Sequence, residues 1–212
     1  MQRILACTYI NAARNPINVN SNKSLVGIGR AGVIKGKSLR LINSVLNGFA
    51  SRVTISNFLL LGFNDFYTFV GNYIYYISGR ALYINTNATA LIILFYSVNN
   101  YFRNIAGYAF DVSVNTYVLL EGNYFDTVTI LGFLESGNVY AVNTVPDASS
   151  CTSYLGYICE WNRVTSNSGA LGLSVDSAAL FKFSGYKSSL VRHILVTNVP
   201  ASVLANAGIG KI

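Results

Sequence analysis

The chain repeats one short pattern of polar and apolar positions three times between residues 71 and 130. The copies are GNYIYYI at 71–77, NNYFRNI at 99–105 and GNYFDTV at 122–128, and each reads Asn-Tyr-apolar-x-x-apolar. A weaker copy, SNFLLLG, begins at Ser56. Repeats spaced by about 20–50 residues are typical of solenoid proteins. The pattern therefore predicts a stack of similar structural units, each with one Asn at a bend.

The apolar residues around these copies predict short strands. Val53 and Ile55 alternate with polar residues, as in a half-buried strand, and the stretches 88–98 and 117–123 are predicted as further strands. Strands joined into repeating coils predict an all-β fold, a right-handed, single-stranded parallel β-helix. The repeated Asn suits the bends, because its side chain can bond backbone groups of its own turn and of the neighbouring coil. Asn also tolerates the left-handed conformation that such bends need.

Composition narrows the fold class. The 212 residues are 52% hydrophobic and only 11% charged, as expected when each strand is buried by the coils above and below. The length fits one domain, residues 1–212, with a repeat core at about 53–130 and a loop-rich C-terminal wrap at 131–212. A membrane protein is disfavoured, because the longest apolar run, Ala90–Tyr96, is far below the ~18 residues of a spanning helix.

The net charge of +7 and the isoelectric point near 9.4 come from scattered basic residues. No run of Lys or Arg indicates an arm that binds nucleic acid, so no nucleic-acid partner is predicted. A diffuse positive field can attract an acidic polysaccharide, and it is equally compatible with a merely soluble basic surface.

Two of the three cysteines lie close together, in CTSYLGYIC at 151–159. A disulfide between Cys151 and Cys159 is sterically easy in an oxidising compartment, whereas in a reducing one both would be free thiols. Their spacing differs from that of a zinc knuckle, and a single histidine, His193, makes a His-rich metal site impossible. The eight acidic residues form no local cluster, so calcium is not expected either. We predict no metal and no cofactor.

Seven phrases of the sequence, taken in order, resemble the pectin lyase family, a branch of the pectate lyase superfamily of parallel β-helices. They are SNKSLVGIGRAGVIKGKSLR, RVTISN, GNYIYYISGRAL, SVNNYFRNIAGYAFDV, NTYVLLEGNYFDTV, CTSYLGYIC and SVLANAGIGKI. One such phrase would be a weak signal. Seven in the family's order cover most of the chain from Ser21 onward, and they identify the chain by resemblance as a member of that family.

The resemblance implies a lyase that cleaves methyl-esterified polygalacturonan, the pectin of plant cell walls, by β-elimination. A base removes the proton at C5, and the C4 glycosidic oxygen leaves. The family also implies a secreted, monomeric protein with a C-terminal disulfide loop and no metal. Secretion would make the sequons at Asn22 and Asn87 available for N-glycosylation.

The resemblance gives Arg80 the role of the catalytic base, because Arg80 occupies the position of the Arg in the family's SGRxP phrase. An ordinary arginine keeps its proton at any working pH, so this role requires an unusual environment or transient deprotonation. The alternative is a stacked surface arginine. Tyr side chains near Arg80 would line the substrate groove, and Tyr83 and Tyr76 are the candidates for substrate binding.

The chain also departs from the family pattern. Ala81, Leu82 and Tyr83 replace x-Pro-Lys, and Tyr108 and Asp111 replace His and Glu. The internal stretch that carries the family's active-site Asp and second Arg is absent, since only residues 41–51 stand in its place.

Two hypotheses follow from the match and its departures. The first is an active pectin lyase that uses Arg80. The second is a shortened, catalytically impaired relative that binds glycan or has no activity. The missing stretch predicts that any lyase activity of this chain is weak.

Overall fold

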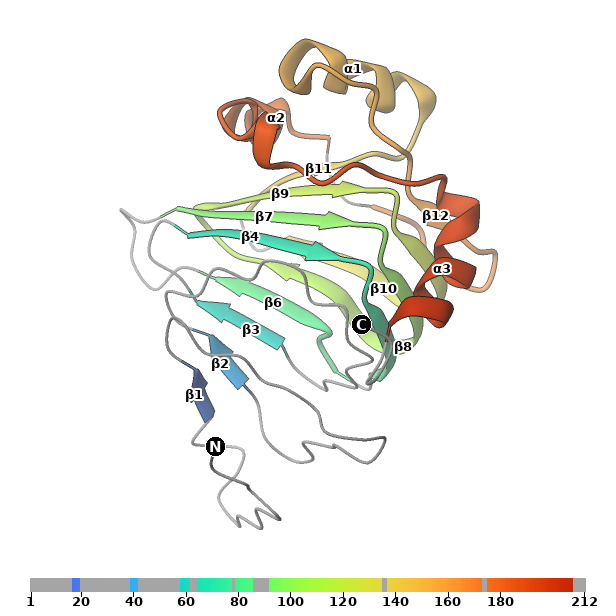
Figure 1. Ribbon diagram of the computed structural model, residues 1–212. Coiled ribbons are helices and arrows are strands. Elements are labelled where there is room, and N and C mark those ends of the chain that lie inside the picture. Colours follow the sequence, from blue (N-terminus) through green and yellow to red (C-terminus); the bar gives the residue numbers. More distant parts are fainter. Residues whose placement is uncertain are drawn as a thin grey trace.

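Two parallel sheets make up the body of the structure (Figure 1). The computed structural model describes residues 17–19, 39–41, 58–61, 65–77, 79–85, 92–134, 137–172 and 175–207. In that part of the chain, the larger sheet runs in the order β1 (Ile17–Val19), β2 (Leu39–Leu41), β3 (Phe58–Leu61), β6 (Leu82–Asn85), β8 (Tyr101–Val112), β10 (Tyr124–Leu134) and β12 (Arg163–Val164), and β5 (Tyr73–Ile77) also pairs with β8. The smaller sheet runs in the order β11 (Asn138–Ala141), β9 (Thr116–Glu121), β7 (Ile93–Val98) and β4 (Asp65–Val70).

Each coil passes from a strand of the smaller sheet, through an asparagine bend, into the larger sheet. The first half of β8 pairs with β5, with Tyr101 opposite Tyr73, and its second half pairs with β6, with Phe110 opposite Leu82. β10 pairs with β8 along both halves. All of these strand pairs are parallel, as are β4, β7, β9 and β11 among themselves. The prediction of a right-handed parallel β-helix is confirmed.

The repeat continues beyond Ile130, where the sequence pattern predicted that it stops. β11 pairs with β9, and β12 pairs with β10, so a further coil follows the three copies. Its bend contains Asn162, which lies 39 residues after the Asn of the preceding copy. The longer spacing arises because α1 (Val145–Leu155) is inserted between the two strands of that coil.

The prediction of a loop-rich stretch after Leu131 is wrong for α1. This helix of 11 residues begins with a capping box, in which Thr144 and Asp147 exchange side-chain and backbone hydrogen bonds, and it ends at Gly156 in the left-handed conformation. Pro146 stands in its first turn. These are standard helix start and stop signals, and they were present in the sequence.

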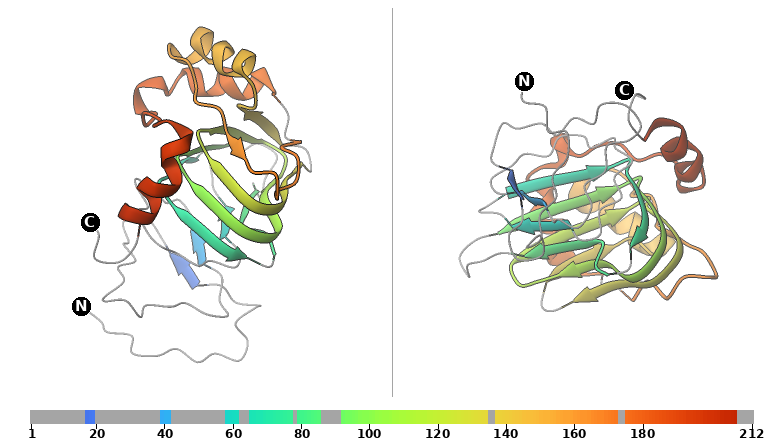
Figure 2. Two further views of the ribbon diagram at one scale, coloured as in Figure 1. Left: turned by 90° about the vertical axis from the view of Figure 1, so that its right-hand side faces the viewer. Right: turned by 90° about the horizontal axis from the view of Figure 1, so that it is seen from below.

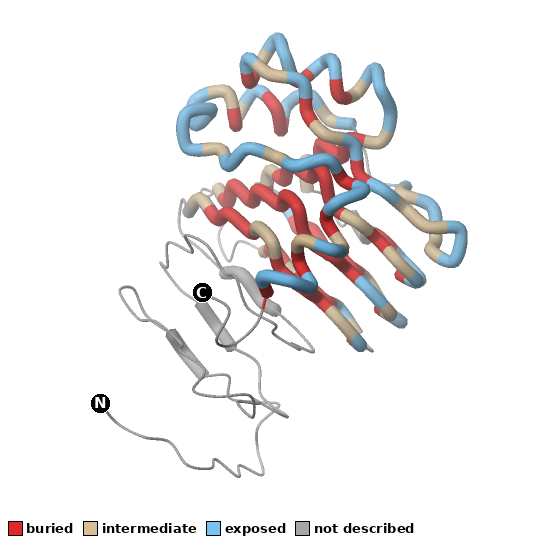
Figure 3. Tube along the Cα trace, turned by 45° about the vertical axis from the view of Figure 1, so that its right-hand side comes forward, coloured by how far each residue is buried: buried red, intermediate tan, exposed pale blue. Residues whose placement is uncertain are grey.

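Side chains of the smaller sheet alternate between two apolar surfaces. In β7, Ile93 and Phe95 lie in the interior of the β-helix, whereas Leu94 and Tyr96 belong to a second cluster on the outer face. That outer cluster is completed by residues of and near α1 and α2 (Ser177–Ser184): Ala148, Cys151, Leu155, Cys159, Ala179, Leu180 and Phe183. Burial on both faces leaves the strands almost continuously buried (Figure 3). The high hydrophobic fraction of the sequence is therefore explained by two features together: the stacking of the coils and the coverage of the sheet by the helices.

The helices that follow β11 cover two parts of the β-helix. α1 and α2 pack against each other at one end of the stack, and α2 also contacts β9 and β11 (Figures 1 and 2). After the short 3-10 helices η1 (Lys187–Ser189) and η2 (Val196–Asn198), α3 (Val199–Asn206) lies beside β8. Its Val199 and Val203 pack on Tyr73 and Tyr101. None of the helices in the described ranges has the length and apolar character needed to cross a membrane.

A column of buried asparagines joins the coils at the bends. The side-chain amide of Asn72 donates to the Asn100 oxygen at 2.8 Å, Asn100 donates to Asn123 at 3.0 Å, and Asn123 donates to Asn162 at 3.0 Å. The same amides also reach the main chain of an adjacent coil, as in the 2.7 Å bond from Asn100 to the carbonyl of Phe69. This column, the asparagine ladder, confirms that each repeated Asn bonds groups of the neighbouring coil.

At the bends of the three repeated phrases, the residue before the ladder asparagine is left-handed. Gly71, Asn99 and Gly122 have φ values of 67°, 56° and 59°. Only Gly, and to a lesser extent Asn, adopts this conformation without a large steric penalty. This explains why the repeats begin with Gly-Asn or Asn-Asn.

Substitution of Asn100 by Ala is expected to destabilise the fold strongly. It removes a side chain that donates to Asn123, Phe69 and Ser97 and accepts from Asn72, in a site with no solvent exposure. Each buried group left without a partner costs about 1–3 kcal/mol, so we expect a loss of about 3–5 kcal/mol in the free energy of unfolding. Denaturant-induced unfolding followed by circular dichroism measures the loss.

The matched control is Asn198→Ala, because Asn198 is an exposed asparagine that makes no capping bond with its side chain. It should change the free energy of unfolding by less than about 0.5 kcal/mol. Similar losses in the two variants would contradict a special role for the ladder.

Candidate active site

Arg80 forms an ion pair with Asp111, and the two side chains differ sharply in exposure. The Nε atom of Arg80 lies 2.6 Å from Oδ2 of Asp111. The Arg80 side chain is 47% exposed, whereas that of Asp111 is fully buried. The guanidinium therefore has one edge fixed by a buried carboxylate and remains accessible from solvent.

Strand register places these residues together. Asp111 lies on β8 directly opposite Tyr83 of β6, and Arg80 is in the segment that leads into β6. The N–H of Ala81 donates to the carbonyl of Tyr108 at 2.7 Å, which joins the two segments just before the paired strands. The backbone on both sides of the ion pair is thus fixed by hydrogen bonds.

Gly107 allows the two segments to approach closely. A Cβ atom at this position would lie 2.2 Å from the carbonyl oxygen of Gly79, closer than any real contact. Any side chain here would push the Arg80 segment away from β8. A glycine at Gly107 is therefore a condition for the Arg80–Asp111 distance.

Tyr83 contacts the guanidinium from a second direction. The Cζ atom of Arg80 lies 5.2 Å from the centre of the Tyr83 ring, within the range of a cation–π interaction. The Tyr83 hydroxyl in turn accepts a hydrogen bond from the Asn85 amide at 3.0 Å. Tyr83, predicted as a substrate-binding residue, therefore lies beside Arg80.

Tyr76 lies on a different strand, β5, and packs edge-on against Tyr75 with ring centres 4.5 Å apart. Its side chain is 67% exposed, and its backbone is left-handed, with a φ of 57°. The described contacts of Tyr76 are thus with the tyrosines of β5. Tyr73, on the same strand, is buried under α3.

A second Arg–Asp pair lies on the outer side of β8 and β10. Arg103 Nε is 3.2 Å from Oδ2 of Asp126, and the hydroxyl of Tyr101 donates to the same oxygen at 3.0 Å. Burial, together with this hydrogen bond to a carboxylate, raises the pKa of Tyr101 to about 12. Arg103 lies in the first half of β8, whereas Asp111 lies in the second half.

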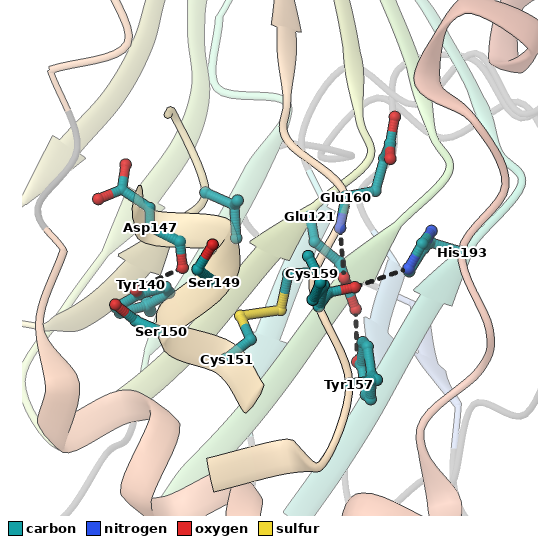
Figure 4. Close-up of a disulfide and its surroundings, with 12 residues drawn as sticks. Glu121, Tyr140, Asp147, Ser149, Ser150, Cys151, Tyr157, Cys159, Glu160 and His193 are labelled. Atoms are coloured by element: carbon teal, nitrogen blue, oxygen red, sulfur yellow. Dashed lines mark hydrogen bonds between the residues drawn. A yellow bond between two sulfur atoms is a disulfide. The ribbon is translucent and has the colours of Figure 1, made fainter. Parts of the chain in front are cut away.

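Cys151 and Cys159 form a disulfide next to a third acidic group, Glu121 (Figure 4). The Glu121 carboxyl is buried at the end of β9, where it contacts the hydroxyls of Tyr96 and Tyr157 at 2.5 and 2.7 Å and accepts from the N–H of Glu160 at 3.1 Å.

The Tyr96 hydroxyl has a second partner, the carbonyl of Val191, at 2.9 Å. A hydroxyl has one hydrogen, so it satisfies both contacts when Glu121 itself carries a proton and donates it to Tyr96. Burial raises the pKa of Glu121 above its ordinary value of 4.5, against the opposing effect of its hydrogen bonds and of His193. The cluster thus joins the C-terminal segment to the smaller sheet through a carboxyl group that favours its neutral form.

Within the described ranges, no three His, Cys, Asp or Glu side chains lie together in a way that could hold a metal ion. Several residues named from the sequence lie outside these ranges: Asn22, Val53, Ile55, Ser56 and Asn87.

Comparison with known proteins identifies the family. The chain is 40% identical to "Probable pectin lyase F-1" of Aspergillus terreus over 281 aligned residues, which cover 98% of this chain and 72% of the relative. It is 39% identical to "Probable pectin lyase E" of Aspergillus fumigatus, with the same coverage. The chain belongs to the pectin lyase family. "Pectin lyase B" of Emericella nidulans is 30% identical over 98% of the chain and 71% of its own length. No family model matches the chain.

The alignment with the first of these pectin lyases is longer than the chain itself. It extends over 281 positions, whereas the chain has 212 residues, so at least 69 positions (281 − 212) are gaps in this chain. The chain is therefore shorter than the aligned part of this relative.

Asp111 is the site residue that the sequence analysis passed over. Its position in the pectin lyase phrase holds Glu, and the resemblance assigns no role to Asp111. The sequence signal for a role was that this position is acidic both in this chain, as Asp, and in the family phrase, as Glu. It lies two residues after an Ala of the strand.

The Glu121 cluster predicts a distinct dependence of stability on pH. The folded protein keeps the Glu121 proton at a pH where the unfolded chain has lost it. The free energy of unfolding should therefore fall as pH rises from about 4.5 toward the folded-state pKa, by up to about 1.4 kcal/mol per pH unit. Glu121→Gln, which is always neutral, should flatten this slope.

Denaturant unfolding of both proteins between pH 4 and pH 8 measures the effect. The two should have similar stabilities near pH 4 and diverge at higher pH in favour of the glutamine variant. Parallel curves across the range would show that the pKa of Glu121 is the same in the folded and unfolded states.

Proposed function

We propose that this chain is a pectin lyase that cleaves methyl-esterified polygalacturonan by β-elimination at Arg80. The observation that supports the proposal is the half-exposed Arg80 guanidinium, which is fixed at Nε by the buried Asp111 and flanked by the Tyr83 ring. The similarity to probable pectin lyases supports the same substrate and reaction class.

In the proposed reaction, Arg80 first loses a proton to solvent. The C5–H bond of the galacturonate ester at the new non-reducing end then breaks, and the neutral guanidine of Arg80 accepts that proton and becomes a guanidinium. The electron pair forms the C4=C5 double bond, and the C4 oxygen leaves with the pair of the glycosidic bond and takes a proton from solvent. Negative charge develops on the ester carbonyl oxygen in the transition state. Preorganised donors at that oxygen are the strongest form of stabilisation available to such a reaction, and a guanidinium provides several of them.

The substrate would bind over the part of the larger sheet that carries Arg80 and Tyr83. An aromatic ring beside a charged donor provides an apolar surface for a sugar ring and a polar partner for its ester. The net charge of +7 would favour association with pectin, whose unesterified residues are acidic. A secreted, monomeric protein that acts on cell walls is part of the proposal.

Arg80→Ala is expected to lower the rate of unsaturated product formation from highly methylated pectin by at least about 100-fold, since it removes the proposed reactive group. Product is measured by the absorbance of the C4=C5 uronide. A chelator should leave the wild-type rate unchanged, because no metal enters the proposed reaction.

Arg103→Ala is the matched control, because Arg103 is also a half-exposed arginine paired with an aspartate. It should keep at least half of the wild-type rate. A folded wild-type protein that forms no unsaturated product would overturn the proposal and leave a family member without lyase activity.

A further inference from the structure

The geometry points to Asp111 as a positioning residue for the proposed reaction: its buried carboxylate holds the Arg80 guanidinium in the orientation that faces the polymer. The inference rests on the function proposed above.

Burial excludes direct contact between Asp111 and a polymer. Its side chain has no solvent exposure, and it lies on β8, the long strand in the middle of the larger sheet. A polysaccharide that binds on the surface could reach Arg80 but not Asp111. Any effect of Asp111 on the reaction must therefore pass through another residue, and Arg80 is its ion-pair partner.

The contact is made to one specific edge of the guanidinium. An arginine has five N–H donors in a rigid, planar fork, one on Nε and four on the two Nη atoms. Asp111 engages Nε, and the Tyr83 ring lies 5.2 Å from Cζ. A carboxylate at the Nε edge and an aromatic ring beside the cation together restrict rotation of the planar group. The Nη atoms are the part that can contact a substrate.

Strand pairing, a hydrogen bond and close packing fix the backbone on both sides of the Arg80–Asp111 pair. Asp111 is in register with Tyr83 across the paired strands, and the Ala81–Tyr108 hydrogen bond and the Gly79–Gly107 contact fix the segment that carries Arg80. A long, flexible side chain thus projects from fixed backbone and is anchored at its far end by a fixed carboxylate. Such preorganisation matters for rate, because a displacement of about 1 Å at a reacting group can cost about 100-fold.

If Asp111 served only to stabilise the fold, an uncharged side chain of the same shape could replace it. Asn has nearly the same shape as Asp and can accept a hydrogen bond from Nε, but it lacks the charge that holds a cation. The second pair, Arg103–Asp126, has the same chemistry between β8 and β10, with a longer distance of 3.2 Å. It therefore provides a matched control for the loss of one aspartate charge.

The test compares Asp111→Asn with Asp126→Asn in steady-state kinetics on highly methylated pectin. We expect Asp111→Asn to lower kcat by about 100-fold with KM changed less than about threefold, since the interaction lost is one that acts in the transition state. Asp126→Asn should keep at least half of the wild-type kcat. Equal kcat values for Asp111→Asn and the wild type would overturn the inference.

A second variant and a second measurement separate this inference from folding and from the proposed function. Asp111→Glu keeps the charge, and it should recover part of the lost kcat at a melting temperature close to that of Asp111→Asn. In nuclear magnetic resonance spectra, the Nε–H of Arg80 should exchange slowly with water in the wild type and in Asp126→Asn, and rapidly in Asp111→Asn.

If the wild type forms no unsaturated product, the proposed function fails, and the exchange experiment alone decides the positioning. Slow exchange that only Asp111→Asn abolishes would still support it. Rapid exchange in the wild type would overturn it.

Discussion

The column of buried asparagine amides is the interaction on which the geometry of the coils depends. The amides of Asn72, Asn100 and Asn123 each donate to the oxygen of the next asparagine, at 2.8–3.0 Å. Those of Asn100, Asn123 and Asn162 also bond the main chain of an adjacent coil. Buried amides that are fully paired specify one arrangement, because any slip of a coil would leave several of them without partners. The register that sets Tyr101 opposite Tyr73 follows from this column, and so does the register that sets Asp111 opposite Tyr83 further along the same strand. The candidate active site is thus a consequence of the ladder.

Coils in a solenoid contact only their neighbours, which makes the fold tolerant of both insertion and loss. The insertion of α1 between β11 and β12 leaves Asn162 in the ladder and β12 paired with β10. The helix is useful where it lies, because it covers apolar side chains on the outer face of the smaller sheet. The alignment with a pectin lyase relative shows the opposite difference, because at least 69 of its positions are gaps in this chain. The described coils still stack in continuous parallel register.

The sequence predicts the features that repeat locally and misses those that depend on long-range register. Asn72, Asn100 and Asn123 share one phrase, so the coil and its ladder were visible. Asn162 was missed because its spacing is longer and Arg163 replaces the usual Tyr. The pairing of Arg80 with Asp111 joins residues 31 positions apart, and it depends on how β6 aligns with β8. Neither the pairing nor the burial of Asp111 can be derived from spacing alone. Tyr76, close to Arg80 in sequence, is packed on Tyr75 because the chain is left-handed at that residue.

The charge balance of the site agrees with an esterified substrate. Arg80 and Asp111 together carry no net charge, and Asp111 is shielded from solvent. A galacturonate methyl ester is itself neutral, so it can approach the pair without adding a charge to a partly desolvated surface. A free galacturonate would bring a carboxylate toward Asp111, and two like charges at short range in a partly buried site are mutually destabilising. Under the proposed function, the ion pair that orients Arg80 would therefore also favour the ester over the acid, while the rest of the basic surface attracts the acidic stretches of the same polymer.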